Sequence, residues 1–522
     1  MNFTDTRTGT PHNLRFSDML VKGIAPSGGL FVPCEITPLD DDALQQLATV
    51  HYADAATAVF QHFGIDFDEA TVRATMQEAY GAQWASTEIT PLVTLDDHTT
   101  ILELFEGPTS AFKDVALQCM PRFMSLALEK HRREDVLEHD LLILVATSGD
   151  TGKAALEGFA DRDATNIIVF YPEDGVSDLQ KRQMQTQVGA NVAVYGVRGN
   201  FDDCQNAVKS VFADATFNEW LHTEANLQLS SANSINWGRL LPQVTYYVRA
   251  AMQSAAMQRG PVDICVPTGN FGNILAAYYA KLLGAPIGQL ICASNANHVL
   301  TDFLQTGVYD ISKRTFYTTS SPSMDILISS NLERLLFHLA GAEAVRDWMT
   351  ALAAHGRFEV DGATRAALQS EFAAAWVDEA TTLATIKRCW DEHRYLLDPH
   401  TAVALAAANA LRHHESSSSA PANPLLVVST AHWAKFAPSV VRALTETAPN
   451  APLPSPYDAH TDLEMLDDVL ALAPGCRPIP APLAALRDAT PRFTDVIDAD
   501  AQSIQCVTKR LSQGDGRRHQ TG

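Results

Sequence analysis

The stretch Asp140–Gly152, DLLILVATSGDTG, decides the fold, because six apolar residues lead into a loop of small polar residues and a helical pattern begins at Lys153. A short, unbroken apolar run is typical of a strand that is buried on both faces. Five further stretches repeat this order of strand, loop and helix: residues 99–107, 166–175, 190–199, 262–273 and 424–432. Repeated units of this kind predict an α/β fold with a mostly parallel sheet covered by helices on both faces.

The segments on either side of these units have other patterns. Residues 1–95 place apolar side chains at helical spacing and contain one Gly/Pro-rich segment, residues 22–33, so a mostly helical N-terminal region with one turn and a short strand is expected. Residues 340–400 are predicted to be helical and charged, and residues 416–424 to form a polar loop. Residues 451–522 are predicted to be a proline-rich extension that ends in a frayed polar tail.

Composition excludes several classes of protein. The chain has 522 residues, too many for one ordinary domain, and its net charge of −23 argues against a general nucleic-acid-binding protein. No apolar run reaches the ~18 residues of a membrane helix, and the N-terminus has no secretory signal pattern. Eight widely spaced cysteines without a CxxC pair predict reduced thiols in a cytoplasmic protein, and no metal site is expected.

The loops that follow the strands are the candidate binding sites, because ligands of open parallel sheets lie beyond the carboxyl ends of the strands. The loop at residues 146–152 offers Ser148, Asp150 and Thr151 beside a helix start whose N–H groups suit an anion. Ordinary capping of the helix by Asp or Thr explains the same residues, so both interpretations stay open.

A second loop, VPTGNFGN at residues 266–273, also leads into a helix. Its Gly269, Asn270, Phe271 and Asn273 form a cup of backbone and amide donors that is suited to a phosphate group, while a turn without a ligand is the alternative. Thr430 stands at the carboxyl end of another predicted strand, where its hydroxyl can meet a ligand.

Lys113 follows a strand and a Gly-Pro turn and has apolar neighbours. In an apolar pocket a lysine amine loses its charge more easily and becomes a nucleophile or base, whereas a surface lysine is merely solvated. A reactive lysine together with a phosphate-binding loop describes a pyridoxal phosphate site. Asn233, Ser234 and Arg239 add an amide, a hydroxyl and a guanidinium that can grip an anionic substrate; a helix cap followed by a surface arginine is the alternative.

Six motifs occur in order along the chain: GPTSAFKD (107–114), ATSGDTG (146–152), NSINWGRLL (233–241), VPTGNFGN (266–273), DPHTA (398–402) and STAHWAKF (429–436). With these motifs the chain resembles the threonine synthase family of fold-type-II pyridoxal phosphate enzymes, which are similar to the tryptophan synthase beta chain. The resemblance covers about residues 5–450 and includes the N-terminal FSDMLVKGIAPSGGLFVP at residues 16–33.

The resemblance implies two parallel-sheet lobes in a catalytic region at residues 96–450, the smaller lobe lying roughly at residues 140–250. It implies conversion of O-phospho-L-homoserine and water into L-threonine and phosphate by a monomer or homodimer. The implied site residues fall into five groups: Lys113 carrying pyridoxal 5'-phosphate; Gly269, Asn270, Phe271 and Asn273 around the cofactor phosphate; Thr430 at the pyridine nitrogen and Asp150 near the ring oxygen; Ser148 and Thr151 at the substrate; Asn233, Ser234 and Arg239 at the substrate phosphate.

Four residues depart from the family pattern. Asn273 stands where many relatives have Asp, Lys153 where they often have a small residue, and Trp237 and Gly238 differ beside the expected phosphate pocket. Two other functions therefore stay open. One is a related phospho-lyase that releases a keto acid, and the other is a non-catalytic ligand-binding relative.

Overall fold

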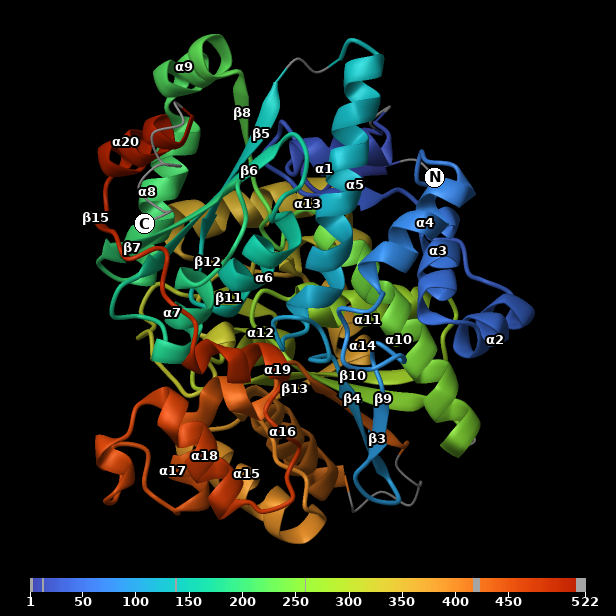
Figure 1. Ribbon diagram of the computed structural model, residues 1–522. Coiled ribbons are helices and arrows are strands. Elements are labelled where there is room, and N and C mark those ends of the chain that lie inside the picture. The colour runs from blue at the N-terminus through green and yellow to red at the C-terminus, as the bar shows by residue number, and fades with distance from the viewer. Residues whose placement is uncertain (1–2, 12–13, 137–138, 259, 416–422, 513–522) are drawn as a thin grey trace.

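The strands of the computed structural model, which describes residues 3–11, 14–136, 139–258, 260–415 and 423–512, form two main sheets (Figure 1). Every neighbouring pair in these two sheets is parallel except one, so the predicted mostly parallel α/β architecture is confirmed. Two short antiparallel pairs lie apart from them, namely β1 (Phe3–Asp5) with β2 (Phe31–Pro33) and β11 (Val308–Asp310) with β12 (Arg357–Glu359).

The smaller sheet has the strand order β15-β7-β6-β5-β8. Its members are β5 (Asp140–Ala146), β6 (Thr165–Pro172), β7 (Val192–Arg198), β8 (Leu227–Ser230) and β15 (Val496–Asp498). The larger sheet has the order β13-β10-β9-β14-β4-β3, and only β3 is antiparallel to its neighbour. Its members are β3 (Leu92–Thr94), β4 (Thr99–Glu103), β9 (Val262–Pro267), β10 (Ile287–Ser294), β13 (Phe372–Trp376) and β14 (Leu425–Ser429).

The prediction that residues 340–400 are helical is wrong at two places, β12 and β13. Strand β13 has the sequence FAAAW, and alanine favours helices. The strand forms because its backbone pairs with β10 over five positions, from Leu290↔Phe372 to Ser294↔Trp376. Pairing with a preformed sheet edge thus outweighs the local propensity, which is weak for strands in any case.

The end of the C-terminal extension is part of the smaller lobe. Strand β15 pairs with β7, and helix α20 (Ala501–Ser512) lies beside α8 (Phe201–Ala213), where Figure 1 shows red against green. The prediction of a frayed tail is therefore wrong for Lys509–Ser512, which form the last turn of α20. Residues 513–522 of that tail and residues 416–422 of the expected polar loop lie outside the described residues.

The helices fall into three runs along the chain. The N-terminal run comprises α1 (Phe16–Lys22), α2 (Asp41–Thr49), α3 (Tyr52–His62) and α4 (Glu69–Ala79). The middle run comprises α5 (Lys113–Arg133), α6 (Asp150–Phe159), α7 (Asp178–Gln185), α8, α9 (Ala215–Ala225), α10 (Trp237–Gln258), α11 (Gly272–Leu282), α12 (Val299–Thr306) and α13 (Leu332–His355). The last run comprises α14 (Gly362–Glu371), α15 (Glu379–His393), α16 (Pro399–Glu415), α17 (Ala437–Leu444), α18 (Asp462–Leu472), α19 (Ala481–Ala484) and α20. Within the described ranges, none of them has both the length and the apolar character of a membrane span.

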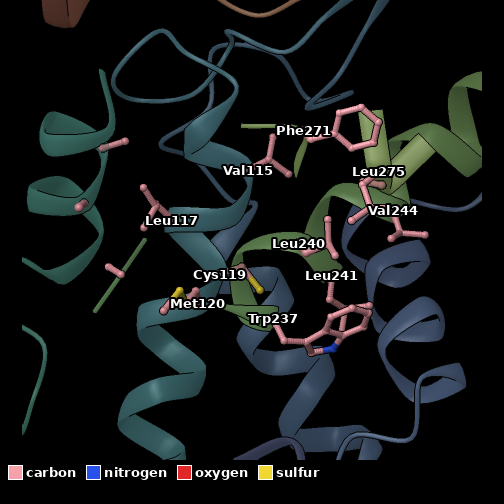
Figure 2. Packing of buried hydrophobic residues seen from close by; sticks show 14 of the residues in the cluster. Val115, Leu117, Cys119, Met120, Trp237, Leu240, Leu241, Val244, Phe271 and Leu275 are labelled. Carbon is pink, nitrogen blue, oxygen red and sulfur yellow. The ribbon is translucent and has the colours of Figure 1, made fainter. Parts of the chain in front are cut away.

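A buried core joins α5, α10 and α11, the helices whose first residues approach the candidate site. Figure 2 shows Leu240 of α10 between side chains of the other two helices, with Trp237 and Val244 of α10 on either side of it. Trp237 is fully buried, and its ring lies against those of Phe3 and Tyr279. Close packing of this kind fixes where each helix begins, and with it the side chains of the first turn.

Helices α5 and α6 touch through Gly158, which allows their backbones to approach closely. A Cβ atom at Gly158 would lie 2.0 Å from the carbonyl oxygen of Leu117, so room exists only if one helix moves. Gly158→Ala is expected to lower the free energy of unfolding by about 1–3 kcal/mol, measured by urea denaturation. Gly362→Ala is the matched control, since a Cβ there meets nothing within 4 Å. An equal effect of the two substitutions would contradict the packing argument.

Candidate active site

Lys113 is the first residue of α5 and is only 8% exposed. Its Nζ atom lies 3.3 Å from Ser323 Oγ and 3.7 Å from Asp150 Oδ2. Burial lowers the pKa of this amine; Asp150 opposes the effect, and the positive charges of Lys435 and Arg239 add to it. The structure therefore places a buried amine with a lowered pKa at this position.

Asp150 is the first residue of α6 and is also buried. Its Oδ1 atom accepts hydrogen bonds from Lys435 Nζ and Gln180 Nε2, both at 2.9 Å, while Oδ2 faces Lys113. Burial alone would raise the pKa of Asp150, but Lys435 and Lys113 outweigh it and hold the pKa below its ordinary range. The carboxylate is thus ionised and faces the amine.

The loop before α6 is organised by Thr147, which sequence reasoning did not single out. Its Oγ1 atom accepts hydrogen bonds from the N–H groups of Gly149 (3.0 Å) and Gly152 (2.9 Å). Gly149 is the N-cap residue, has φ = 131°, and provides no side-chain cap. Capping by Asp150 or Thr151 therefore does not explain this motif, and the partly buried Ser148 and Thr151 lie beside the first free N–H groups of α6.

Arg239 lies in the first turn of α10 and is 4% exposed. One guanidinium nitrogen donates to the carbonyl oxygen of Ala232 at 2.7 Å, while Nε is buried without a hydrogen-bond partner. Within the described part of the chain, no carboxylate forms an ion pair with Arg239, and burial lowers its pKa to about 10. A buried cation without a counter-charge is costly, so this position is built for an anion that the chain does not supply.

The two other residues expected near Arg239 lie in the loop before α10. Ser234 Oγ lies 3.4 Å from Ser330 Oγ and 3.4 Å from Asn331 Nδ2. Asn233 is exposed, and its backbone carbonyl accepts from Asn236 N–H at 3.1 Å. In this conformation the guanidinium is buried while the Asn233 amide faces outward.

The loop at residues 268–273 ends in α11 and approaches the rest of the site closely. A Cβ atom at Gly269 would lie 2.6 Å from the carbonyl oxygen of Ser323, so only glycine fits. Asn270 is exposed. Phe271 has φ = 61° and turns its ring into the core, as Figure 2 shows, so only its backbone is free to meet a ligand. Asn273 Oδ1 accepts from two tyrosine hydroxyls, which leaves its buried Nδ2 without a partner.

Thr430 follows β14 and is buried next to the loop that carries Lys113. Its carbonyl oxygen accepts a hydrogen bond from Phe112 N–H at 2.8 Å, and Ala111 and Ala431 form a backbone bridge. The end of β14 is therefore fixed directly to the residue that precedes Lys113.

Three functional candidates were missed by sequence reasoning: Lys435, Ser323 and His400. Lys435 is buried, and its Nζ also donates to the carbonyl oxygen of Thr109 at 2.9 Å. His400 Nε2 accepts from Ser323 N–H at 3.2 Å, and its Nδ1 contacts Asp398 Oδ1 at 2.8 Å. For Lys435 a signal was available, because apolar residues flank it on both sides in WAKFA.

Of the four residues that depart from the family pattern, Asn273 lies in the site, whereas Lys153, Trp237 and Gly238 make their contacts outside it. Lys153 forms an ion pair with Glu157 at 2.9 Å. Trp237 points into the core. A Cβ atom at Gly238 would lie 2.3 Å from Leu20 Cδ1, so this glycine serves the packing of α10 on α1.

Residues from the C-terminal extension also reach the Lys113 loop. The guanidinium of Arg477 pairs with Glu103 and Glu106, two buried carboxylates at the end of β4. Its carbonyl oxygen accepts from Trp433 Nε1 at 3.0 Å. The extension thus neutralises charge directly behind the loop.

The residues present fit pyridoxal phosphate. Lys113 and Lys435 both face the buried carboxylate of Asp150, and the buried guanidinium of Arg239 is close enough to Lys113 to lower its pKa, so the site carries excess positive charge that suits anionic groups. The tight turn at Gly269 and the unpartnered Asn273 Nδ2 add donors beside a helix start. A buried amine with a lowered pKa completes the requirements of a lysine-bound cofactor.

Comparison with known proteins identifies the family. Residues 86–430 match the family described as pyridoxal-phosphate dependent enzyme, residues 2–80 match the threonine synthase N terminus, and residues 401–507 match the threonine synthase C-terminal region. The chain belongs to the threonine synthase family. The resemblance stated from the motifs is thereby confirmed, as are the fold-type-II architecture and pyridoxal 5'-phosphate as the cofactor.

Relatives within the family include proteins named threonine synthase and others named threonine synthase-like 1. Threonine synthase of Eremothecium gossypii is 36% identical over 530 residues, which cover 97% of each chain. Threonine synthase-like 1 of Homo sapiens is 41% identical over 443 residues, which cover 82% of this chain and 58% of that protein. The chain therefore spans less than two thirds of the threonine synthase-like 1 proteins that it matches.

Solved structures of the threonine synthase family have the same fold. The PLP-bound threonine synthase from Brucella melitensis superposes with a TM-score of 0.82 at 36% identity, and all of both chains is covered. Yeast threonine synthase gives a TM-score of 0.84 at 32% identity, with 98% of both chains covered.

Proposed function

We propose that this protein is a threonine synthase, which converts O-phospho-L-homoserine and water into L-threonine and phosphate. The observation that carries the proposal is the buried guanidinium of Arg239, which lacks an acidic partner among the described residues and is close enough to Lys113 to lower the pKa of its amine. A phosphorylated amino acid brings the missing anion to a site that already holds a reactive amine. Full-length similarity to threonine synthases supports the same substrate.

In this proposal Lys113 holds the cofactor covalently. Gly269, Asn270, Phe271 and Asn273 surround its phosphate through backbone N–H groups and the free Asn273 amide. Thr430 would face the pyridine nitrogen, and Asp150 would lie near the ring oxygen. A hydroxyl at the nitrogen, in place of a carboxylate, would leave that nitrogen largely unprotonated and moderate the electron sink.

The reaction needs a base, and Lys113 provides it. Once the substrate's amine has replaced Lys113 on the cofactor, pyridoxal phosphate would supply an electron sink that stabilises the charge left when the substrate's α-proton is removed. The freed Lys113 amine takes that proton, because burial favours its neutral form before the transfer. Asp150 Oδ2, at 3.7 Å, then stabilises the ammonium that results.

Departure of phosphate needs positive charge and hydrogen-bond donors. Arg239, Asn233 and Ser234 hold the substrate phosphate in this proposal, and the guanidinium stabilises the negative charge that develops as the bond to the γ-carbon breaks. Ser148 and Thr151, beside the start of α6, orient the rest of the substrate. A β-proton is lost as phosphate leaves the γ-carbon, the γ-carbon is protonated, and water is then added at the β-carbon.

A related phospho-lyase that releases 2-oxobutanoate is the second candidate. It is kept because identity is higher to proteins named threonine synthase-like 1, at 41–42%, than to the threonine synthases of Eremothecium gossypii and Pseudomonas aeruginosa, at 36% and 38%. The proposed location is the cytoplasm, since all eight cysteines are free thiols. A monomer or homodimer stays a prediction.

Incubation of the cofactor-loaded protein with O-phospho-L-homoserine tests the proposal. Phosphate and L-threonine are expected in equal amounts, measured together in one reaction. Phosphate with 2-oxobutanoate and no threonine would assign the phospho-lyase. Neither product, with the cofactor still bound, would contradict both activities and favour a ligand-binding relative.

A further inference from the structure

Lys435 is a second buried lysine beside the proposed cofactor lysine. It lies in the short helix η2 (Trp433–Phe436), which follows β14. Its side chain is fully buried, and its Nζ binds Asp150 Oδ1 and the carbonyl oxygen of Thr109, each at 2.9 Å. Thr109 belongs to the loop that precedes Lys113, so one ammonium group joins the loop after β4 to the loop after β5.

These contacts fix the direction of Asp150. Its Oδ1 atom is held by Lys435 and by Gln180 Nε2 at 2.9 Å, which leaves Oδ2 to face Lys113. Rotation of the carboxylate would break both bonds in a buried place, where unmade hydrogen bonds are costly. Lys435 thereby holds one carboxylate oxygen of Asp150 toward the Lys113 amine.

The charge of Lys435 also acts on the proton that Lys113 and Asp150 share. With Lys435 present, the net charge of Lys113, Asp150 and Lys435 together falls from +1 to zero when this proton is lost. Without Lys435 the same loss would create a buried net negative charge, which is unfavourable. Lys435 therefore lowers the pKa of the Lys113–Asp150 pair whichever partner carries the proton, because a nearby positive charge makes proton release easier from either.

We propose that Lys435 is a positioning residue that holds Asp150 as a carboxylate aimed at Lys113 and eases release of the proton from the Lys113 nitrogen. The proposal rests on Lys113 being the cofactor lysine, as proposed above. Nearby ionisable groups do not reverse the sign. Arg239 acts on Lys113 in the same direction, and burial raises the pKa of Asp114 to about 6, against which Lys435 acts.

The test is a pH titration of the absorbance of the bound cofactor in the holoenzyme, which follows the proton on the nitrogen that attaches it. Lys435→Met is expected to move the transition to higher pH by about 1 or more. Lys435→Arg keeps the charge and should titrate within a few tenths of the wild type. Lys153→Met, the same change on a lysine paired with Glu157, is the matched control and should not move the transition.

Lys435→Gln removes the charge but keeps a hydrogen-bond donor, so it replaces the methionine variant if that variant does not fold. A second readout is the acidic limb of the pH profile of kcat, which should move in the same direction. An unchanged transition in the folded neutral variant, or an equal movement in Lys435→Arg, would overturn the proposal. Borohydride reduction and peptide mass spectrometry of the wild type locate the attached lysine separately. Attachment elsewhere than Lys113 would refute the proposed cofactor lysine instead.

Discussion

Lys113→Ala is expected to abolish covalent attachment of the cofactor and to lower turnover by about 10³-fold or more, since both the attachment point and the base are lost. Turnover is measured as phosphate release from O-phospho-L-homoserine. Attachment is measured by borohydride reduction followed by peptide mass spectrometry. The variant is expected to fold, so the loss of turnover reports lost chemistry and not unfolding.

Folding is preserved because Asp150 is not left alone in the variant. Its Oδ1 atom keeps the bonds from Lys435 and Gln180, so removal of Lys113 does not strand a buried carboxylate. Removal of a buried amine also removes its desolvation cost. The circular dichroism spectrum and the urea midpoint are therefore expected to stay close to those of the wild type.

Lys130→Ala is the matched control on the same helix, α5. Lys130 is partly exposed and pairs with Asp66 at 2.7 Å, a contact of small energetic value at a surface. Its loss should leave turnover and attachment unchanged. Near-normal turnover of Lys113→Ala would instead move the cofactor to another lysine, and Lys435 would be the first to examine because its side chain is also buried.

The sequence patterns predicted the parts of the site that follow strands. Each of the loops after β4, β5, β9 and β14 was identified from an apolar run followed by small polar residues, and these runs are legible because strands buried on both faces are almost wholly apolar. The resulting side chains do meet: Lys113 and Asp150, 37 positions apart in sequence, approach to 3.7 Å.

The parts that were not predicted depend on tertiary contacts. Ser323 belongs to a segment between β11 and α13 that has no hydrophobic periodicity, so nothing local places it beside Lys113. Strand β13 exists only because the edge of β10 is available to its alanine-rich backbone. Arg477 lies in the predicted proline-rich extension, yet it neutralises two buried carboxylates at the end of β4.

Arg239→Met is expected to weaken binding of the phosphorylated substrate by one to two decades, since charge-assisted hydrogen bonds contribute about 1.5–3 kcal/mol. Attachment of the cofactor should be little affected. The weaker binding is measured in two ways: as KM for O-phospho-L-homoserine, and as the affinity for inorganic phosphate, followed by the thermal shift that phosphate causes. An unchanged KM would place the substrate phosphate elsewhere.

The same substitution is expected to stabilise the protein without ligand. Arg239 is a buried cation with an unpartnered Nε, and an apolar side chain of similar length removes that cost at the loss of one hydrogen bond to Ala232. A rise of about 1–2 kcal/mol in the free energy of unfolding is expected.

Arg334→Met provides the opposite case. Arg334 is equally buried, but its guanidinium donates to the carbonyl oxygens of Phe31 at 2.9 Å and Ile235 at 2.6 Å. Its removal breaks these buried charge-assisted hydrogen bonds, so stability should fall, by about 2–3 kcal/mol. Changes of opposite sign in the free energy of unfolding would show that the Arg239 charge serves ligand binding, whereas the Arg334 charge stabilises the fold. Equal losses of stability would show that Arg239 serves the fold as well.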